Sequence, residues 1–194
     1  METRRIAKAD FDHIVEVVDR WWGGPIHAQV HPMFFYELGD HALIVEEGGI
    51  IIGFLLGFVA LSEVKRNYPP TPGAGVGVKT GYVHLVGIHP EYRRRGVGRL
   101  LYKDFIRECT LAGCTRMKAI TTPGNEGSIR FHLAVGWQTT EMEDYAGHKR
   151  RRIVFTKDVS PENEPAPASG LPAASGAEGS GAGITETGGH RDRN

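Results

Sequence analysis

The sequence is poor in the features that mark several common classes of protein. It has only two cysteines, Cys109 and Cys114, and neither belongs to a CxxC pair or a histidine cluster. We therefore expect both thiols to be reduced packing residues, with no disulfide and no bound metal. Positive and negative side chains balance at 23 each, so no overall positive field predicts a nucleic-acid partner.

Long apolar segments and repeats are also missing. The N-terminal residues METRRIAKADFD lack the apolar stretch of a signal peptide. The longest apolar run, residues 50–61, is far shorter than the ~20 residues of a membrane-spanning helix, and we interpret it as a buried strand. Residues 42–46 and 50–60 predict a hairpin around Glu47-Gly48-Gly49, because Gly-Gly suits a two-residue turn. We expect a cytoplasmic protein that does not bind membranes.

The composition changes abruptly near Asp158. Residues 1–158 have a mixed composition and suffice for one domain with a sizeable core. Residues 159–194 consist largely of Pro, Ala, Gly, Ser and Glu, which cannot bury enough apolar area to order the chain. We predict a folded domain over 1–158 and a disordered low-complexity tail over 159–194.

The most informative stretch is residues 82–101, YVHLVGIHPEYRRRGVGRLL. Residues 82–88 are rich in β-branched and aromatic side chains and predict a strand. From Val97 the apolar residues recur at helical spacing. Between the two lies a basic turn with two glycines, where free amides at a helix N-terminus favour an anion. A strand, a glycine turn and a helix in this order predict a pyrophosphate site.

This turn resembles motif A of the GCN5-related N-acetyltransferase (GNAT) superfamily. The motif is Arg or Gln, two residues, Gly, one residue, then Gly or Ala, and Arg93, Gly96 and Gly98 match it. The resemblance extends to a second stretch, where the superfamily often has Asn, a small residue, Tyr and Gly-Phe. Asn125, Ser128, His132, Gly136 and Trp137 stand at those offsets, with His in place of the usual Tyr.

The resemblance implies an α/β (α+β) fold. The family has a mixed, strongly twisted sheet of about six to seven strands flanked by about four helices. Its fourth and fifth strands splay apart, and acetyl-coenzyme A (acetyl-CoA) enters the gap as co-substrate. No metal is implied. The cofactor-binding residues implied by the resemblance are Val86, Gly87, Ile88, Arg93, Arg94, Arg95, Gly96, Val97, Gly98, Arg99, Thr121, Asn125 and Ser128.

Two histidines are candidates for the proton transfers of amine acetylation. By strand alternation, Tyr82, His84, Val86 and Ile88 share one face. Arylalkylamine acetyltransferases have a histidine at the position of His84 that helps to remove the amine proton; a core histidine is the alternative. The tyrosine that His132 replaces often protonates the leaving thiolate, so we expect His132 to be the acid.

The acceptor side is less clearly marked. Residues 4–9 predict a first strand, and Asp10 then caps a predicted helix with a buried face of Phe11, Ile14, Val18 and Trp21. Trp22 points away from that face, and the resemblance places it and Tyr82 beside the acceptor. Residues 141–145 and 151–157 predict a closing hairpin that should border the acceptor, and its Glu141, Glu143 and Asp144 predict a cationic acceptor. The proline- and glycine-rich connection of residues 62–81 either covers the acceptor side or is a surface loop.

Three functions remain open from the sequence. The protein transfers an acetyl group to the primary amine of a small molecule, or to a peptide or protein amine, or it binds acyl-CoA without catalysis. Retention of both histidines favours an enzyme, and we expect a small-molecule acceptor and a monomer or homodimer.

Overall fold

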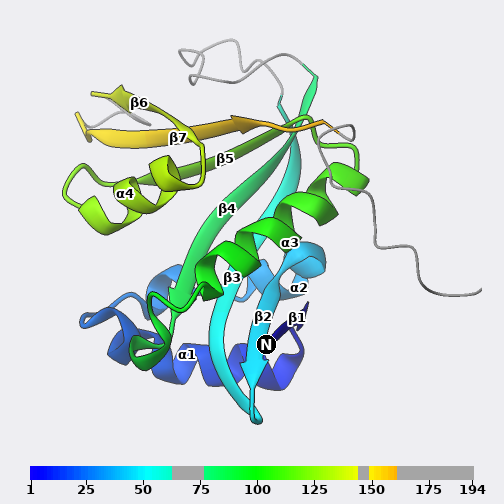
Figure 1. Cartoon of the computed structure of the whole chain (residues 1–194), viewed down its shortest axis with the longest axis vertical. Helices are drawn as coiled ribbons and strands as arrows, with labels where there is room; N and C mark the ends of the chain where they lie inside the picture. The colour runs from blue at the N-terminus through cyan, green and yellow to red at the C-terminus, as the bar shows by residue number, and fades with distance from the viewer. Residues whose placement is uncertain (63–76, 144–148, 161–194) are drawn as a thin grey trace, which may run out of the picture. The chain divides into compact units, whose positions relative to one another are not determined.

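The structure, a computed structural model, describes residues 1–62, 77–143 and 149–160 (Figure 1). The helices and strands of this part of the chain form one compact unit within Met1–Glu164. In chain order the strands and α-helices are β1 (Glu2–Arg5), α1 (Lys8–Trp22), α2 (Met33–Tyr36), β2 (Leu43–Glu47), β3 (Ile50–Ser62), β4 (Val78–Ile88), α3 (Val97–Leu111), β5 (Arg116–Thr121), α4 (Glu126–Ala134), β6 (Gln138–Met142) and β7 (Arg152–Asp158).

The strands form one mixed sheet. Its seven strands run in the order β1-β2-β3-β4-β5-β7-β6, and every neighbouring pair is antiparallel except the parallel pair β4–β5. The predicted hairpin of β2 and β3 is confirmed, with Gly48 and Gly49 as its two-residue turn. A mixed sheet flanked by helices confirms the predicted fold class.

The central strands β4 and β5 stay together over only part of their length. Their pairing runs from Thr80 opposite Arg116 to Val83 opposite Ala119 and then stops. Strand β4 continues to Ile88 with a partner only on the β3 side, while β5 continues along β7. Figure 1 shows the two strands meeting at one end and diverging at the other. The predicted splay between the fourth and fifth strands is confirmed.

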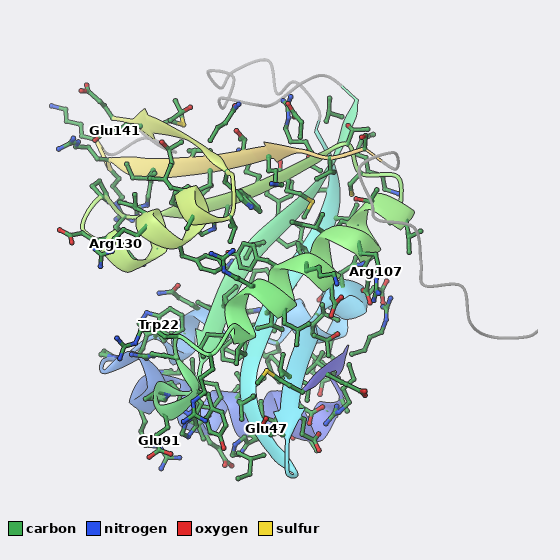
Figure 2. All side chains as sticks on the ribbon, in the orientation of Figure 1. Trp22, Glu47, Glu91, Arg107, Arg130 and Glu141 are labelled. Carbon is green, nitrogen blue, oxygen red and sulfur yellow. The ribbon has the colours of Figure 1, made fainter. Side chains whose placement is uncertain are left out.

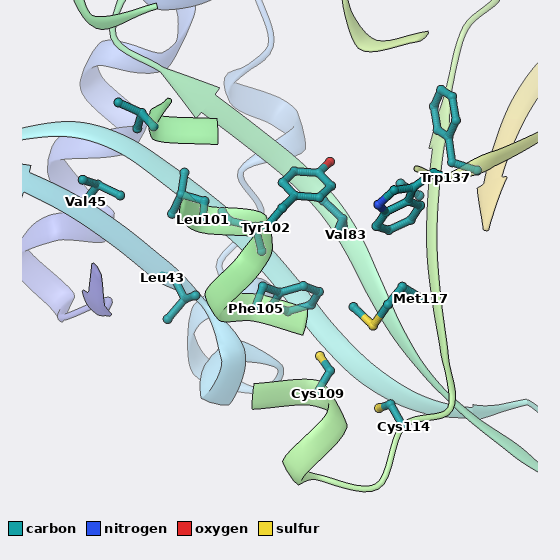
Figure 3. Close-up of a cluster of buried hydrophobic side chains, with 14 of the residues drawn as sticks. Leu43, Val45, Val83, Leu101, Tyr102, Phe105, Cys109, Cys114, Met117 and Trp137 are labelled. Atoms are coloured by element: carbon teal, nitrogen blue, oxygen red, sulfur yellow. The ribbon is translucent and has the colours of Figure 1, made fainter. Parts of the chain in front are cut away.

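Each face of the sheet has its own apolar core. Helix α3 buries Val97, Leu101, Phe105 and Cys109 against one face, the stripe that the sequence predicts, together with Trp137 and Phe155. Figure 3 shows part of this cluster, with Tyr102 of α3 near Val83 and Trp137. Helices α1 and α2 cover the other face with a second cluster that includes Phe11, Ile14, Val18, Trp21 and Phe34. Both cysteines are free and buried.

The start of α1 differs from the prediction. Asp10 is not the N-cap residue, because the helix begins at Lys8 and Ala7 is its N-cap. The Asp10 carboxylate instead accepts a hydrogen bond from the Ala7 amide (2.7 Å) and two from the Arg4 guanidinium (2.6 and 2.9 Å). Asp10 therefore stabilises the free amides of the helix start from within the first turn.

Several element boundaries also differ from the prediction. The first strand was predicted over residues 4–9 but spans Glu2–Arg5, because the chain leaves the sheet once Arg5 has paired with Leu43. Strand β4 begins at Val78, where it pairs with Ser62, so part of the predicted 62–81 connection is strand. Strand β6 begins at Gln138 rather than at Glu141, since Gln138 pairs with Thr156.

Some predictions lie outside the described residues. They concern the proline-rich segment 63–76, Asp144 and most of the tail, residues 161–194. Within the described part of the chain, no helix combines the length and the apolar character needed to cross a membrane.

We expect Asp10→Ala to lower the free energy of unfolding by about 1–2 kcal/mol, because the Ala7 amide and the Arg4 guanidinium both lose their acceptor. Asp12→Ala is the matched control on the same helix, since it removes only an exposed ion pair with Lys8 and should barely change stability. Urea unfolding of both variants measures the difference. Equal midpoints for the two would contradict this role of Asp10.

Candidate active site

A cavity of about 730 Å³ lies where β4 and β5 part. Its walls come from the end of α1, the second half of β4, the end of β5, and helices α3 and α4. Ten residues that the sequence predicts for the site line it: Trp22, His84, Val86, Ile88, Arg93, Gly98, Thr121, Asn125, Ser128 and His132. Segments far apart in the sequence therefore meet at one opening in the sheet.

Seven predicted residues are not in the cavity wall. Tyr82 stacks on Phe58, with ring centroids 5.1 Å apart. Gly87 faces Phe54 on the far side of the sheet, and Val97 is buried in the core. The remaining four belong to the turn before α3 or to its first turn: Arg94, Arg95, Gly96 and Arg99.

The turn before α3 has the geometry of an anion site. Gly96 is the N-cap of α3 with φ +88°, a left-handed conformation that glycine adopts without strain. The first backbone hydrogen bond of the helix runs from the Leu100 amide to the Gly96 carbonyl (3.0 Å). The amides of residues 97–99 thus have no partner within the helix, and the helix dipole adds positive charge there.

Gly98 lets a ligand approach this turn closely. A Cβ atom at Gly98 would lie 3.4 Å from the Phe131 ring, an ordinary contact, so a side chain is compatible with the fold. Because Gly98 lines the cavity, that side chain would instead occupy ligand space. The residues present therefore fit a pyrophosphate group next to the helix N-terminus.

Arg93 connects the turn to the neighbouring elements. Its guanidinium donates to the carbonyl of Trp21, at the end of α1, and to the carbonyl of Ile88 (3.4 Å), at the end of β4. Trp21 is buried, as predicted, whereas the adjacent Trp22 is 42% exposed and lines the cavity. Figure 2 shows Trp22 on the same side of the molecule as the end of β4.

A β-bulge at His84 changes the side-chain alternation of β4. Leu56 and Gly57 are consecutive in β3, yet they pair with Leu85 and Val83, so His84 is an extra residue. The predicted common face of Tyr82, His84, Val86 and Ile88 is therefore wrong. Tyr82 and His84 face α2, whereas Val86 and Ile88 pack on the α3 side.

The bulge places His84 beside an aromatic ring at the cavity. Its imidazole stacks on Phe34 with ring centroids 3.7 Å apart, and its Nε2–H donates to the Gln29 carbonyl (2.9 Å). Burial lowers the pKa of His84, although the hydrogen bond to Gln29 opposes this. The neutral ring therefore presents Nδ1 as a hydrogen-bond acceptor.

His132 is buried within a hydrogen-bonded chain. Its Nδ1–H donates to the Ser128 carbonyl (2.8 Å), and its Nε2 accepts from the Tyr102 hydroxyl (2.9 Å). The ring stacks on Phe155 at 3.9 Å. Burial lowers the pKa of His132 to about 4, so the ring is neutral at pH 7.

Tyr102 is a cavity residue that the sequence does not reveal. It lies one position beyond Leu101 on α3, so the helical pattern marks it only as a partly apolar neighbour of the buried stripe. Burial raises the pKa of its hydroxyl. The aromatic residue on α3, 30 positions from His132, becomes a site residue only through the hydrogen bond between them.

Acidic groups are missing from the described cavity wall. Glu141, predicted to border the acceptor, forms an ion pair with Arg151, and Figure 2 shows it at the far end of β6. Of the described residues, no cluster of three or more His, Cys, Asp or Glu side chains could hold a metal ion. His27 instead contacts the Asp19 carboxylate at 2.6 Å. The wall thus offers cations, hydroxyls and aromatic rings.

The chain is similar in sequence to known acetyltransferases. The model of the acetyltransferase (GNAT) family matches residues 11–137. Aminoglycoside N(6')-acetyltransferase type 1 of Salmonella typhimurium is 29% identical over 146 residues, which cover 73% of this chain and 94% of that protein. An L-methionine sulfoximine/L-methionine sulfone acetyltransferase of the same organism is 29% identical over 58% of each chain.

Solved structures share the fold. Chaetomium thermophilum Naa20 in complex with a bisubstrate analogue has a TM-score of 0.65 at 18% identity, covering 88% of this chain and 94% of that one. The acetyltransferase yncA of Salmonella typhimurium, solved with acetyl-CoA, has a TM-score of 0.56 at 19% identity, with coverage of 84% and 96%.

The buried His132 should make stability sensitive to mild acid. Its pKa lies near 4 in the folded protein against an ordinary value of 6.5. The unfolded chain therefore binds the proton first, and stability that is complete above pH 6.5 falls as the pH approaches 4, by up to about 3 kcal/mol. We expect His132→Phe to be less stable than wild type at pH 7 but to lose less stability on acidification.

Urea unfolding at pH 7, 6, 5 and 4.5 measures this. His13→Gln, which replaces an exposed histidine on α1, is the control and should follow the wild-type curve. Parallel pH curves for His132→Phe and wild type would show that His132 is not the group that titrates.

Proposed function

Because the chain belongs to the GNAT acetyltransferase family, we propose that it transfers the acetyl group of acetyl-CoA directly to the primary amine of a small molecule. Acetyl-CoA-dependent N-acetyltransfer is the activity of this family. The main support for the proposal is the cavity between β4 and β5. The start of α3 with its free amides, the open edge of β4 and both histidines meet there.

The cofactor-binding residues have separable roles in this proposal. The amides of residues 97–99 bind the pyrophosphate, and the absence of a side chain at Gly98 leaves room for it. The unpaired edge of β4, residues 84–88, hydrogen-bonds to the amide groups of the pantetheine arm. The same edge supplies an N–H to the thioester oxygen as negative charge develops there. Thr121, Asn125 and Ser128 line the opposite wall.

His84 is the proposed acceptor of the amine proton. An alkylamine with a pKa near 10 is mostly protonated at pH 7 and must lose a proton before its nitrogen can attack the thioester carbon. The neutral ring of His84, with Nδ1 free to accept, suits this step directly or through one water. Phe34 and the Gln29 carbonyl fix the ring plane and the tautomer.

His132 and Tyr102 together are the proposed source of the thiolate proton. Neutral His132 has its only N–H directed at Ser128, so the hydrogen between His132 and Tyr102 is the hydroxyl proton of Tyr102. That proton can move to a thiolate in the cavity, which both side chains line. The phenolate then regains a proton released from the amine. His132 acts here by holding Tyr102.

A small-molecule acceptor is supported by the sequence relatives. Both are named for small amine-bearing acceptors, an aminoglycoside and amino-acid derivatives. Trp22 and His84 give the cavity an aromatic wall, and Phe34 stacks on His84.

We expect acetyl-CoA to raise the melting temperature and to release free thiol in the presence of some small primary amines. A panel of amino acids, amino sugars, polyamines, arylalkylamines and short peptides, read by thiol detection, tests this. Gly98→Leu should fold, since Phe131 leaves room for Cβ, but should lose both the stabilisation by acetyl-CoA and the activity. Gly113→Leu is not a suitable control for Gly98→Leu, because Gly113 has φ +85° and a leucine there would strain the backbone.

Stabilisation of Gly98→Leu by acetyl-CoA would contradict the pyrophosphate assignment. Acetylation of hydroxyl compounds or of peptides alone would contradict the proposed acceptor class.

The two proton-transfer roles predict different kinetics. His84→Ala should lower turnover most at low pH, where the amine is protonated, and recover partly as the pH rises. His132→Phe and Tyr102→Phe should each lower turnover by about 10- to 1000-fold with little change in acetyl-CoA affinity. His132→Tyr keeps a hydroxyl in this region and should retain more activity than His132→Phe.

Measured pH–rate profiles with one good acceptor decide between these roles. Wild-type turnover in both Phe variants would remove the pair from the mechanism and leave solvent as the acid. An effect of His132→Phe without one of Tyr102→Phe would assign the proton to His132 alone.

A further inference from the structure

Lys118, in the middle of β5, is a buried cation for which the described residues supply no anionic partner. The residue is 5% exposed, and no carboxylate of the described chain pairs with its ammonium group. Burial lowers the pKa of Lys118 to about 8. An unpaired buried ammonium is costly for the fold. A partner from outside the chain would offset that cost.

Strand alternation places Lys118 on the face of the sheet that also presents Tyr82 and His84, and of these three only His84 lines the described cavity. Its neighbours Met117 and Ala119 are buried under α3, so Lys118 points to the opposite face. There it lies beside Tyr82, its partner across the parallel pair, with Nζ 5.6 Å from the ring centroid. The last pair before the strands part, Val83 with Ala119, is the next one along.

A row of aromatic rings connects Lys118 with His84. Phe34 stacks on His84 at 3.7 Å and lies 6.0 Å from Phe58, which stacks on Tyr82 at 5.1 Å. Lys118 ends the row. The proposed amine-activating histidine and the ammonium group of Lys118 thus stand at the two ends of one continuous row of rings.

On this face, the described parts of β4 to β7 carry more positive than negative side chains. Arg152 lines the cavity, and by alternation with the buried Phe155 it shares the face of Lys118. The one carboxylate that the described parts of β4 to β7 place on this face, Asp158, already pairs with Arg116 at 2.7 Å. Lys118 and Arg152 are therefore positive charges on this face that no carboxylate in the described parts of β4 to β7 pairs with.

The geometry points to Lys118 as the binding residue for an anionic group carried by the acceptor amine. This inference rests on the proposed function, and it narrows the acceptor to primary amines that also bear a carboxylate or another anion such as a phosphonate. The ammonium of the substrate would face His84 and its anionic group would face Lys118, with the apolar part on the aromatic row. The anion replaces the missing partner of Lys118.

The spacing favours acceptors in which the two groups are separated. Lys118 and His84 lie one strand apart and two residues apart along the strands, so their Cα atoms are separated by about 8 Å. Both side chains reach inward from there. Aryl amino acids such as 4-(aminomethyl)benzoate separate the two groups across a ring, whereas phenylalanine carries both on one carbon, so these two kinds of compound are the ones to compare.

The test uses matched pairs of amines that differ only in the anionic group. Phenylalanine is compared with phenylalaninamide, and 4-(aminomethyl)benzoate with 4-(aminomethyl)benzamide. The phosphonate analogue of phenylalanine distinguishes a carboxylate site from a general anion site. Each compound is assayed for acetylation and, separately, for stabilisation of the acetyl-CoA-saturated protein against heat. The variants are Lys118→Met, Lys118→Arg and Arg152→Gln.

We expect wild type to prefer the anionic member of a pair by about 10-fold or more in kcat/KM, mostly through KM, in line with one charge-assisted contact. Lys118→Met should abolish the preference while keeping activity on the amide, and Lys118→Arg should keep part of it. Arg152→Gln is the control, because it removes another positive charge from the same face. It should retain the preference for the anionic member of each pair. Lys118→Met should fold at least as stably as wild type, because it removes a buried unpaired charge.

Two other outcomes would overturn the inference. One is equal use of both members of each pair by wild type, and the other is an equal loss on both in Lys118→Met. In either case, acetylation of the amides leaves the proposed function intact. If no amine is acetylated, the proposed function fails, and the stabilisation data alone decide whether Lys118 binds the anion.

Discussion

The feature on which the rest of this structure depends is that β4 and β5 pair over only part of their length. Four residue pairs hold them together, and after Val83 and Ala119 each strand follows a different neighbour. Backbone groups inside a sheet require partners. The opening therefore leaves unsatisfied groups along β4 that a ligand with amide groups can complete. The glycine turn follows directly at the end of that strand, so the anion site and the open edge are neighbours by chain connectivity.

Burial, rather than neighbouring charges, shifts the pKa values of the polar groups around the opening. His132 and Tyr102 are both kept neutral, the first by a lowered pKa and the second by a raised one. Their hydrogen bond then joins two uncharged groups whose donor and acceptor roles are fixed by the Ser128 carbonyl. On the other side of the sheet, His84 is oriented by Phe34 and Gln29. The groups proposed to transfer protons are thus held apart on opposite faces.

Local patterns predicted most of the fold and half of the site. The stripe of α3, the Gly48–Gly49 hairpin and the turn at Gly96 depend on residues close together in the sequence. The bulge at His84 depends on the register between β3 and β4, which no local pattern specifies. In the sequence pattern, Tyr102 is an ordinary helix residue. Lys118 is an ordinary solvent-facing strand residue in the same pattern. Their roles arise from burial and from partners on distant elements.

The bulge in β4 also makes the site sensitive to chain length. Because of one extra residue, the first half of the strand presents Tyr82 and His84 to α2, and the second half presents Val86 and Ile88 to α3. Deleting one residue here would restore a regular pleat and turn one half of the strand over. Substitutions in β4 change single contacts, whereas an insertion or deletion exchanges an entire face. The spacing between Tyr82 and Ile88 is therefore under stronger constraint than most of the side chains within it.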